Sequence, residues 1–245
     1  MTALPEDRYA RLDFNSPLSD ERAALLIAEA EPTGGERVVD LGCGWGELLL
    51  RTVTAAPGAT GDGVDTSPYA LERGRRNATA RGLADRVTFH EAEAASWTGT
   101  GYDLAICIGS SHAWPTGTDE ALAALREAVV HGGRVIFGEA YWEQPPSTEA
   151  LDGLGAEPDD FGTLADLVDR ASAARFRPLL ISTASRDEWE TFESRYAGGV
   201  ERWLLANPDH ADAADIRTVV ASHRDGWLRG YRDTLGLAYL VLVAV

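Results

Sequence analysis

The feature that most constrains this chain is a run of alternating glycines at the end of an apolar segment. Residues 37–46 read RVVDLGCGWG, and the helical pattern ELLLR follows directly. At a strand-to-helix junction of this kind a glycine lets a ligand approach the backbone, because no Cβ stands in the way. The segment therefore predicts a buried strand, a ligand-binding turn at Gly42, Gly44 and Gly46, and then a helix.

The spacing of these glycines argues against a nicotinamide site. The dinucleotide fingerprint is G-x-G-x-x-G, whereas here the third glycine is Gly46 and Glu47 stands where the last glycine is required. A second strand-like run ends in Asp65, and an acid about 20 residues after the first glycine accepts hydrogen bonds from ribose hydroxyls. A nucleotide-type cofactor is expected, and a dehydrogenase is the least favoured of the enzyme classes.

Four segments of the chain occur together in a fixed order. They are residues 38–46 (VVDLGCGWG), 64–68 (VDTSP), 77–87 (NATARGLADRV) and 91–94 (EAEA). In this order and spacing they resemble the class I, Rossmann-like S-adenosylmethionine-dependent methyltransferases of the small-molecule type. The resemblance implies S-adenosylmethionine as cofactor. It also implies a doubly wound α/β fold with a mostly parallel seven-stranded sheet, whose last strand is antiparallel and lies between the fifth and the sixth.

The same resemblance implies which residues contact the cofactor. The three glycines pass under its methionine part, with Asp40 near the amino group, and Asp65 takes the ribose hydroxyls. Glu93 stands where the family commonly has Asp beside the adenine amine. The full expected set is Asp40, Gly42, Gly44, Gly46, Asp65, Thr66, Glu93, Ala94 and Ile108.

Strand-like runs alternate with helix-length segments through the first five runs, which predicts a largely parallel sheet with helices on both faces. The expected strands are residues 37–41, 60–65, 87–91, 102–108, 133–138, 178–183 and 237–245. At 245 residues the chain is long enough for one large α/β domain. We expect a single methyltransferase domain, with an N-terminal lid or helix (1–35), a cofactor-binding core (36–185), a helical cap insertion (186–235) and the last strand (236–245).

Two segments extend beyond a minimal fold. The first precedes the first strand, with Ser19 as N-cap of a helix over residues 22–30. The second, residues 186–234, carries two aromatic stripes at helical spacing separated by Asn-Pro-Asp, which predicts a helical hairpin. Either the hairpin only packs on the rest of the protein, or both additions form a lid that excludes water from the site; the pattern leaves both readings open.

Two residues at the ends of the fourth and fifth strands are the expected catalytic pair. His112 follows the fourth strand, and the ordinary pKa of histidine suits a general base. Glu139 emerges from the fifth, beside aromatic residues. One of them is expected to move a proton while the other orients or charge-pairs with the acceptor. The expected substrate-binding residues are Tyr9, Trp114, Tyr141 and Trp142.

The amino-acid composition limits which classes of molecule the protein is expected to bind. The chain has 22 basic and 39 acidic residues, a net charge of −17, and such a surface repels the phosphates of nucleic acid. It contains no lysine, which removes lysine as a base or nucleophile. Its two cysteines, Cys43 and Cys107, form no disulfide framework, and no metal site is indicated. We expect a cytoplasmic enzyme with a small-molecule substrate and without membrane partners; the oligomeric state is not indicated.

These observations predict methyl transfer from S-adenosylmethionine to an oxygen or nitrogen of a small molecule by in-line displacement. In this chemistry the protein mainly positions the reactants. Two alternatives share the cofactor site. One is an aminopropyl transferase, although paired acids for a polyamine are not evident. The other is a cofactor-binding protein with a regulatory role and no methyl transfer.

Overall fold

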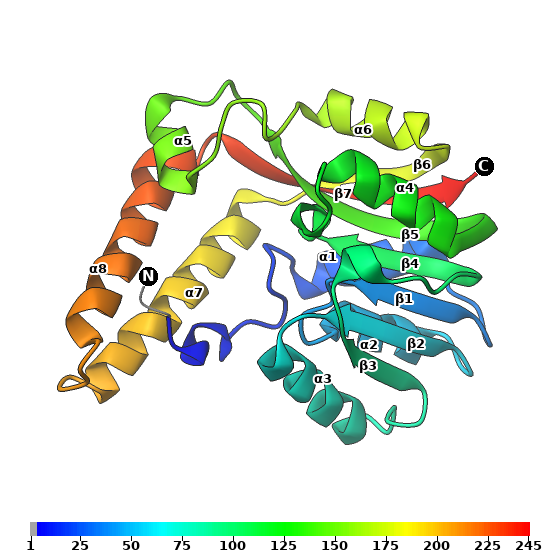
Figure 1. Ribbon diagram of the computed structural model, residues 1–245, viewed down its shortest axis with the longest axis horizontal. Coiled ribbons are helices and arrows are strands. Elements are labelled where there is room, and N and C mark those ends of the chain that lie inside the picture. The colour runs from blue at the N-terminus through cyan, green and yellow to red at the C-terminus, as the bar shows by residue number, and fades with distance from the viewer. Residues whose placement is uncertain (1–3) are drawn as a thin grey trace. The chain divides into compact units, whose positions relative to one another are not determined.

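A computed structural model describes residues 4–245 of the chain, and its backbone confirms the predicted α/β class (Figure 1). Seven strands form one sheet in the order β3-β2-β1-β4-β5-β7-β6. Their bounds are β1 Arg37–Leu41, β2 Thr60–Asp65, β3 Val87–Glu91, β4 Tyr102–Ile108, β5 Val129–Trp142, β6 Phe176–Thr183 and β7 Leu235–Ala244.

The sheet is mostly parallel, with one antiparallel pair. β1 pairs in parallel with both β2 and β4, and β6 pairs antiparallel with β7. The last strand lies between the fifth and the sixth, as predicted. Because the chain leaves β1 toward β2 on one side and later returns to β4 on the other, the carboxyl end of β1 is a topological switch point. Ligands of open α/β sheets bind in the crevice at such a point.

The first four strands have the predicted bounds, whereas the fifth continues to Trp142 rather than ending at Gly138 and starts at Val129 rather than at Gly133. The early start follows from a register shift on its neighbour. Tyr102 pairs with Val129 while Leu104 pairs with Arg134, so the irregular stretch between them continues the strand instead of ending it. Gly132, with a φ of +77°, supplies the left-handed conformation that this stretch needs.

The helices begin at residues that cap them. Ser19 accepts from the backbone N–H of Arg22 at the start of α1, which begins at Asp20 rather than at Arg22. Ser67 does the same for α3, where Pro68 is the first helical residue. The helices are α1 Asp20–Ala30, α2 Glu47–Ala55, α3 Pro68–Ala80, α4 Thr118–Ala128, α5 Thr148–Leu154, α6 Leu164–Ala173, α7 Arg186–Ala206 and α8 Ala213–Asp225. Short helical turns are η1 Glu6–Tyr9, η2 Ala94–Ser96, η3 Ser111–Ala113 and the π-helical η4 Gly226–Tyr231.

The chain divides into two compact units. The sheet unit consists of Ser19–Glu139, Ala165–Thr183 and Ala238–Val245. The helical unit consists of Met1–Leu18, Ala140–Leu164 and Ala184–Leu237. The helical unit thus combines the first part of the expected N-terminal extension (1–35), whose helix α1 belongs to the sheet unit, with residues 140–164 and the expected insertion (186–235).

Within the sheet unit, one aromatic ring fixes the packing beside the glycine turn. A Cβ added to Gly46, Gly63 or Gly74 would lie within 2.6, 2.9 and 2.7 Å of the ring of Phe89. The side chain of Phe89 on β3 therefore occupies the space that three absent Cβ atoms leave. Any larger residue at these positions would displace it.

Within the helical unit, α7 and α8 form the predicted hairpin, with the turn at residues 207–212. Their buried residues form one hydrophobic cluster, namely Ala197, Val200, Leu204, Ala213, Ile216 and Val220. On η4, Gly226 lies against Gly153 of α5 so closely that a Cβ on either glycine would lie 2.8 Å from the other's carbonyl oxygen. No described helix is long and apolar enough to cross a membrane.

Candidate functional site

The glycine turn after β1 has the backbone geometry that its sequence predicts. Gly42, Gly44 and Gly46 all have positive φ angles, of +77°, +55° and +66°. This left-handed region costs a residue with a Cβ about 1–2 kcal/mol. A Cβ on Gly42 would also lie 2.2 Å from the Oγ of Ser110, whereas one on Gly44 would have no atom within 4 Å. The turn is therefore packed at Gly42 and open at Gly44.

Ser110 ties the turn to the end of β4. This buried side chain lies within hydrogen-bond distance of two carbonyl oxygens, and its Oγ is 3.2 Å from the oxygen of Gly42 and 3.1 Å from that of Ile108. One hydroxyl proton serves both acceptors. Sequence reasoning missed Ser110; its only signal is its place directly after Gly109 at the carboxyl end of a buried strand.

Asp65 holds the other side of the turn. Its Oδ2 accepts from the backbone N–H of Gly44 at 2.7 Å, and its Oδ1 accepts from the N–H of Ser67 at 2.8 Å. Both are charge-assisted bonds, the stronger kind. The carboxylate at the end of β2 thus fixes the open glycine of the turn and the start of α3 together, and its remaining lone pairs are suited to accept from hydroxyls.

Asp40, the acid before the first glycine, is buried at the carboxyl end of β1, with 4% of its surface exposed. Burial raises its pKa to about 8, and the nearby negative charge of Asp65 adds to the shift. The carboxyl of Asp40 therefore carries its proton at neutral pH. A cationic group placed beside it would favour release of that proton.

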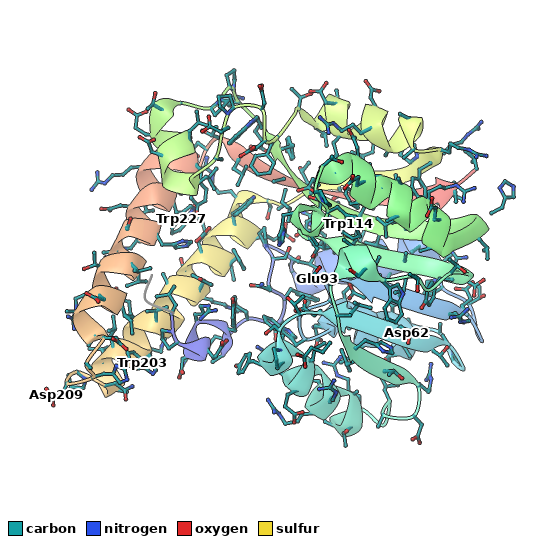
Figure 2. All side chains as sticks on the ribbon, viewed as in Figure 1. Asp62, Glu93, Trp114, Trp203, Asp209 and Trp227 are labelled. Atoms are coloured by element: carbon teal, nitrogen blue, oxygen red, sulfur yellow. The ribbon has the colours of Figure 1, made fainter. Side chains whose placement is uncertain are left out.

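The remaining expected cofactor residues follow neighbouring strands. Thr66 lies just after β2 and is exposed, and Glu93 lies after β3 and is exposed (Figure 2). Ala94 is buried at the start of η2, and Ile108 is partly buried at the end of β4. Because the register pairs Asp65 with Glu91, β2 and β3 end at the same edge of the sheet. The structure thus places all nine expected residues at or just after the carboxyl ends of β1, β2, β3 and β4.

The expected catalytic residues lie on or after the next two strands. Ile108, the last residue of β4, pairs with Gly138, and Glu139 is the next residue of β5, which continues to Trp142 rather than ending before Glu139 as predicted. Glu139 is buried, and its Oε2 lies 3.4 Å from the Oγ1 of Thr118, a long hydrogen bond. His112 is exposed on η3, and within residues 4–245 nothing hydrogen bonds to its ring. Trp114 is buried two residues later.

Comparison with known proteins gives consistent matches. A family model described as a methyltransferase domain matches residues 38–133. The chain is 30% identical to the Escherichia coli protein YjhP over 238 residues, 94% of each chain. A crystal structure of an S-adenosylmethionine-dependent methyltransferase from Thiobacillus denitrificans, in complex with S-adenosyl-L-homocysteine, has a TM-score of 0.88 at 27% identity and covers both chains completely. The chain belongs to the class I S-adenosylmethionine-dependent methyltransferases.

A further relative of this methyltransferase covers nearly its whole length. The trans-aconitate 2-methyltransferase of Streptomyces avermitilis is 27% identical over 228 residues, 89% of this chain and 83% of that protein. The similarity therefore extends beyond the segment that the family model matches.

Three of the four expected substrate-binding residues of the methyltransferase lie in the helical unit, where each has packing partners. Tyr9 contacts the ring of Tyr196, with centroids 6.0 Å apart. The hydroxyl of Tyr141 donates to Glu143 at 2.8 Å. The Nε1 of Trp142 donates to the carbonyl oxygen of Pro158 at 3.0 Å, and Trp142 belongs to a buried cluster with Trp227 and Tyr231.

Neither cysteine of the methyltransferase is arranged as a nucleophile. Burial raises the pKa of both thiols well above the usual value of a thiol. Asp40 and Asp65 add to the rise in the pKa of Cys43. Glu139 and Asp40 add to the rise in the pKa of Cys107. Both side chains stay protonated, and thiolates are the reactive form. In the described part of the chain no group of three or more His, Cys, Asp and Glu side chains is placed to hold a metal ion.

Proposed function

We propose that this methyltransferase transfers a methyl group from S-adenosylmethionine to an oxygen or nitrogen of a small-molecule acceptor, by in-line displacement. The observation that carries the proposal is the turn after β1. Its open glycine, Gly44, is held by Asp65 at a topological switch point, with all other expected cofactor residues on adjacent strand ends. The Thiobacillus denitrificans relative, which matches along its whole length, binds S-adenosyl-L-homocysteine.

The residues present fit the cofactor. A Cβ on Gly44 would have no atom within 4 Å, so a ligand has room to approach the backbone there. Asp65 and Glu93 supply acceptors for hydroxyl and amine donors, and the buried carboxyl of Asp40 suits a cationic amino group. Thr66, Ala94 and Ile108 would complete the contacts. When bound, S-adenosylmethionine supplies an electrophilic methyl on a sulfonium, so no nucleophilic side chain is required.

On the acceptor side, His112 and Glu139 would contact the acceptor. Their strands are neighbours: His112 follows the carboxyl end of β4, and Glu139 lies on β5 directly after Gly138, which pairs with the last residue of β4. Trp114, Tyr9, Tyr141 and Trp142 stay the proposed substrate-binding residues. Holding the acceptor about 3 Å from the methyl, in line with the departing sulfur, is worth ~7–11 kcal/mol of barrier.

The acceptor is a small molecule rather than nucleic acid. A net charge of −17 opposes the binding of a phosphate backbone. The similarity to a trans-aconitate 2-methyltransferase, over 89% of this chain, supports the same class.

The proposal is tested by incubating the full chain with labelled S-adenosylmethionine and a panel of phenols, carboxylic acids, alcohols and amines, with total RNA and DNA as further arms. Formation of S-adenosylhomocysteine with one small-molecule class is the expected result. Robust label in either nucleic acid, or no turnover with any class by a protein that binds no cofactor, would overturn it.

A further inference from the structure

A buried carboxylate joins the helices of the helical unit. The side chain of Glu193, on α7, is only 3% exposed. Its Oε1 accepts from the hydroxyl of Tyr231 at 2.7 Å, and its Oε2 lies 2.7 Å from Nε2 of His223. A buried carboxylate is costly unless it is hydrogen-bonded or paired. Here each carboxylate oxygen has one close donor. Burial and the charge of Glu193 raise the pKa of Tyr231, so its hydroxyl keeps the proton that it donates.

This contact fixes the orientation of His223. Because Nε2 faces a carboxylate, it carries the proton and donates, which leaves the lone pair of the neutral ring on Nδ1. The His223 side chain is 34% exposed, and no group among residues 4–245 hydrogen bonds to Nδ1. A carboxylate that holds an imidazole in one tautomer is the arrangement of a histidine general base. Among residues 4–245, by contrast, no carboxylate is hydrogen-bonded to His112, which lies on η3.

The accessible edge of His223 lies within an aromatic cluster, which we define as Tyr9, Phe192, Tyr196 and His223. The ring of Tyr196 is 5.1 Å from that of His223, 6.3 Å from that of Phe192 and 6.0 Å from that of Tyr9. All four residues are partly exposed rather than buried. Such rings favour a planar ligand that packs against their faces and edges.

The charges around this cluster decide which planar ligand fits. The guanidinium of Arg8 lies 4.3 Å from the centre of the Tyr9 ring, and its charge opposes the rise that burial and the acids Glu193 and Glu6 cause in the pKa of Tyr196. Beside the Tyr9 ring, this positive charge favours an anionic oxygen. An ammonium ligand is disfavoured, because Arg8 repels it and because Glu193 already has a donor on each oxygen.

We propose that the aromatic cluster binds a planar aromatic hydroxyl compound and that His223 takes up the hydroxyl proton. The O–H bond breaks, its electron pair stays on the oxygen, and the proton joins Nδ1. The products are a phenolate beside Arg8 and an imidazolium paired with Glu193. Glu193 and Tyr231 act as positioning residues. We identify this compound with the methyl acceptor, and that identification rests on the proposed function. The binding of the compound and the proton uptake by His223 do not rest on it.

The test uses 4-nitrophenol, whose phenol and phenolate forms absorb at different wavelengths, with the full chain and no cofactor. Saturable formation of phenolate, at a pH where free 4-nitrophenol is largely protonated, is expected. His223→Gln, which has no basic nitrogen, should lose the signal. The matched control is His210→Gln, in the turn between α7 and α8, where the ring packs on Trp203; it should keep the signal. Tyr196→Leu should weaken the affinity and leave the bound probe ionised.

Three results would overturn the inference. They are absence of binding or of ionisation with the wild-type chain, an unchanged signal in a folded His223→Gln variant, and tighter binding of benzyltrimethylammonium than of 4-nitrophenol. The wild-type result decides even if a variant does not fold. Calorimetry with S-adenosylhomocysteine on the same protein separates the two proposals. Intact binding of that ligand with no phenolate formation refutes this inference alone, whereas absent binding refutes the proposed function.

Discussion

Replacing Gly44 by alanine isolates the role of the open glycine in the turn. The added Cβ would meet no protein atom within 4 Å, so any loss of ligand affinity reports a ligand at that place. The φ of +55° makes alanine strained there. The strain costs the folded state about 1–2 kcal/mol, which lowers the melting temperature of a chain of this size by roughly 2–8 °C.

Gly82→Ala is the matched control. Gly82 has a φ of +68°, and its added Cβ would also meet nothing within 4 Å, but it lies after α3, outside the expected site. Both variants should therefore lose similar stability. Only Gly44→Ala should also lose affinity for S-adenosylhomocysteine, by about 1–3 kcal/mol, the usual cost of overpacking, which is roughly 5- to 150-fold in Kd.

Thermal melting of the ligand-free variants and titration calorimetry with S-adenosylhomocysteine measure the two effects separately. Equal affinities in Gly44→Ala and Gly82→Ala would refute the argument that the cofactor passes over Gly44. A much larger stability loss in Gly44→Ala than in Gly82→Ala would show that its surroundings are not open.

Three further predictions concern the same protein. Asp40, whose pKa is about 8 in the folded chain against an ordinary value of 3.8, holds a proton that the unfolded chain has lost; stability should therefore fall as pH rises from about 4 to about 8. In Asp40→Asn, melting curves across this range should show a flatter dependence, and an unchanged slope would contradict the assignment. His112→Ala and Glu139→Gln should keep cofactor affinity and lose turnover, and wild-type rates in both would mean that neither contacts the acceptor. If residues 9–15 and 186–234 close during transfer, their hydrogen exchange should slow when cofactor and acceptor bind, and unchanged exchange would exclude a lid.

The fold was largely predictable because most of its strands are apolar runs bounded by turn residues. β1 to β4 have the expected bounds. α5 was not predicted, because this short helix buries only Ala150 and so shows no periodicity. The division into two units was not foreseen either, since the helical unit is assembled from three separate stretches of chain.

The candidate site was likewise predictable only in part. The spacing in the sequence identifies the glycine turn and Asp65, and in the structure the backbone N–H of Gly44 donates a hydrogen bond to Asp65. Ser110 and Glu193 were missed because their importance arises from burial and partners. Glu193 does lie on the apolar face of α7, between Trp189, Tyr196 and Val200 in helical spacing, but an isolated acid in a sequence does not reveal that a histidine and a tyrosine on another helical segment face it.

The central claim is that the turn after β1 and Asp65 bind S-adenosylmethionine and its demethylated product. Calorimetry with S-adenosylhomocysteine tests it most directly, on the wild-type chain and on Asp65→Ala. The control is Asp62→Ala, because Asp62 lies on the same strand but is hydrogen-bonded to His90 and Tyr102. Asp65→Ala should weaken binding by about 1–3 kcal/mol, the scale for unpaired hydrogen-bonding groups, and Asp62→Ala should leave it unchanged. Undiminished affinity in Asp65→Ala, or preference of the wild-type chain for a nicotinamide nucleotide, would contradict the claim.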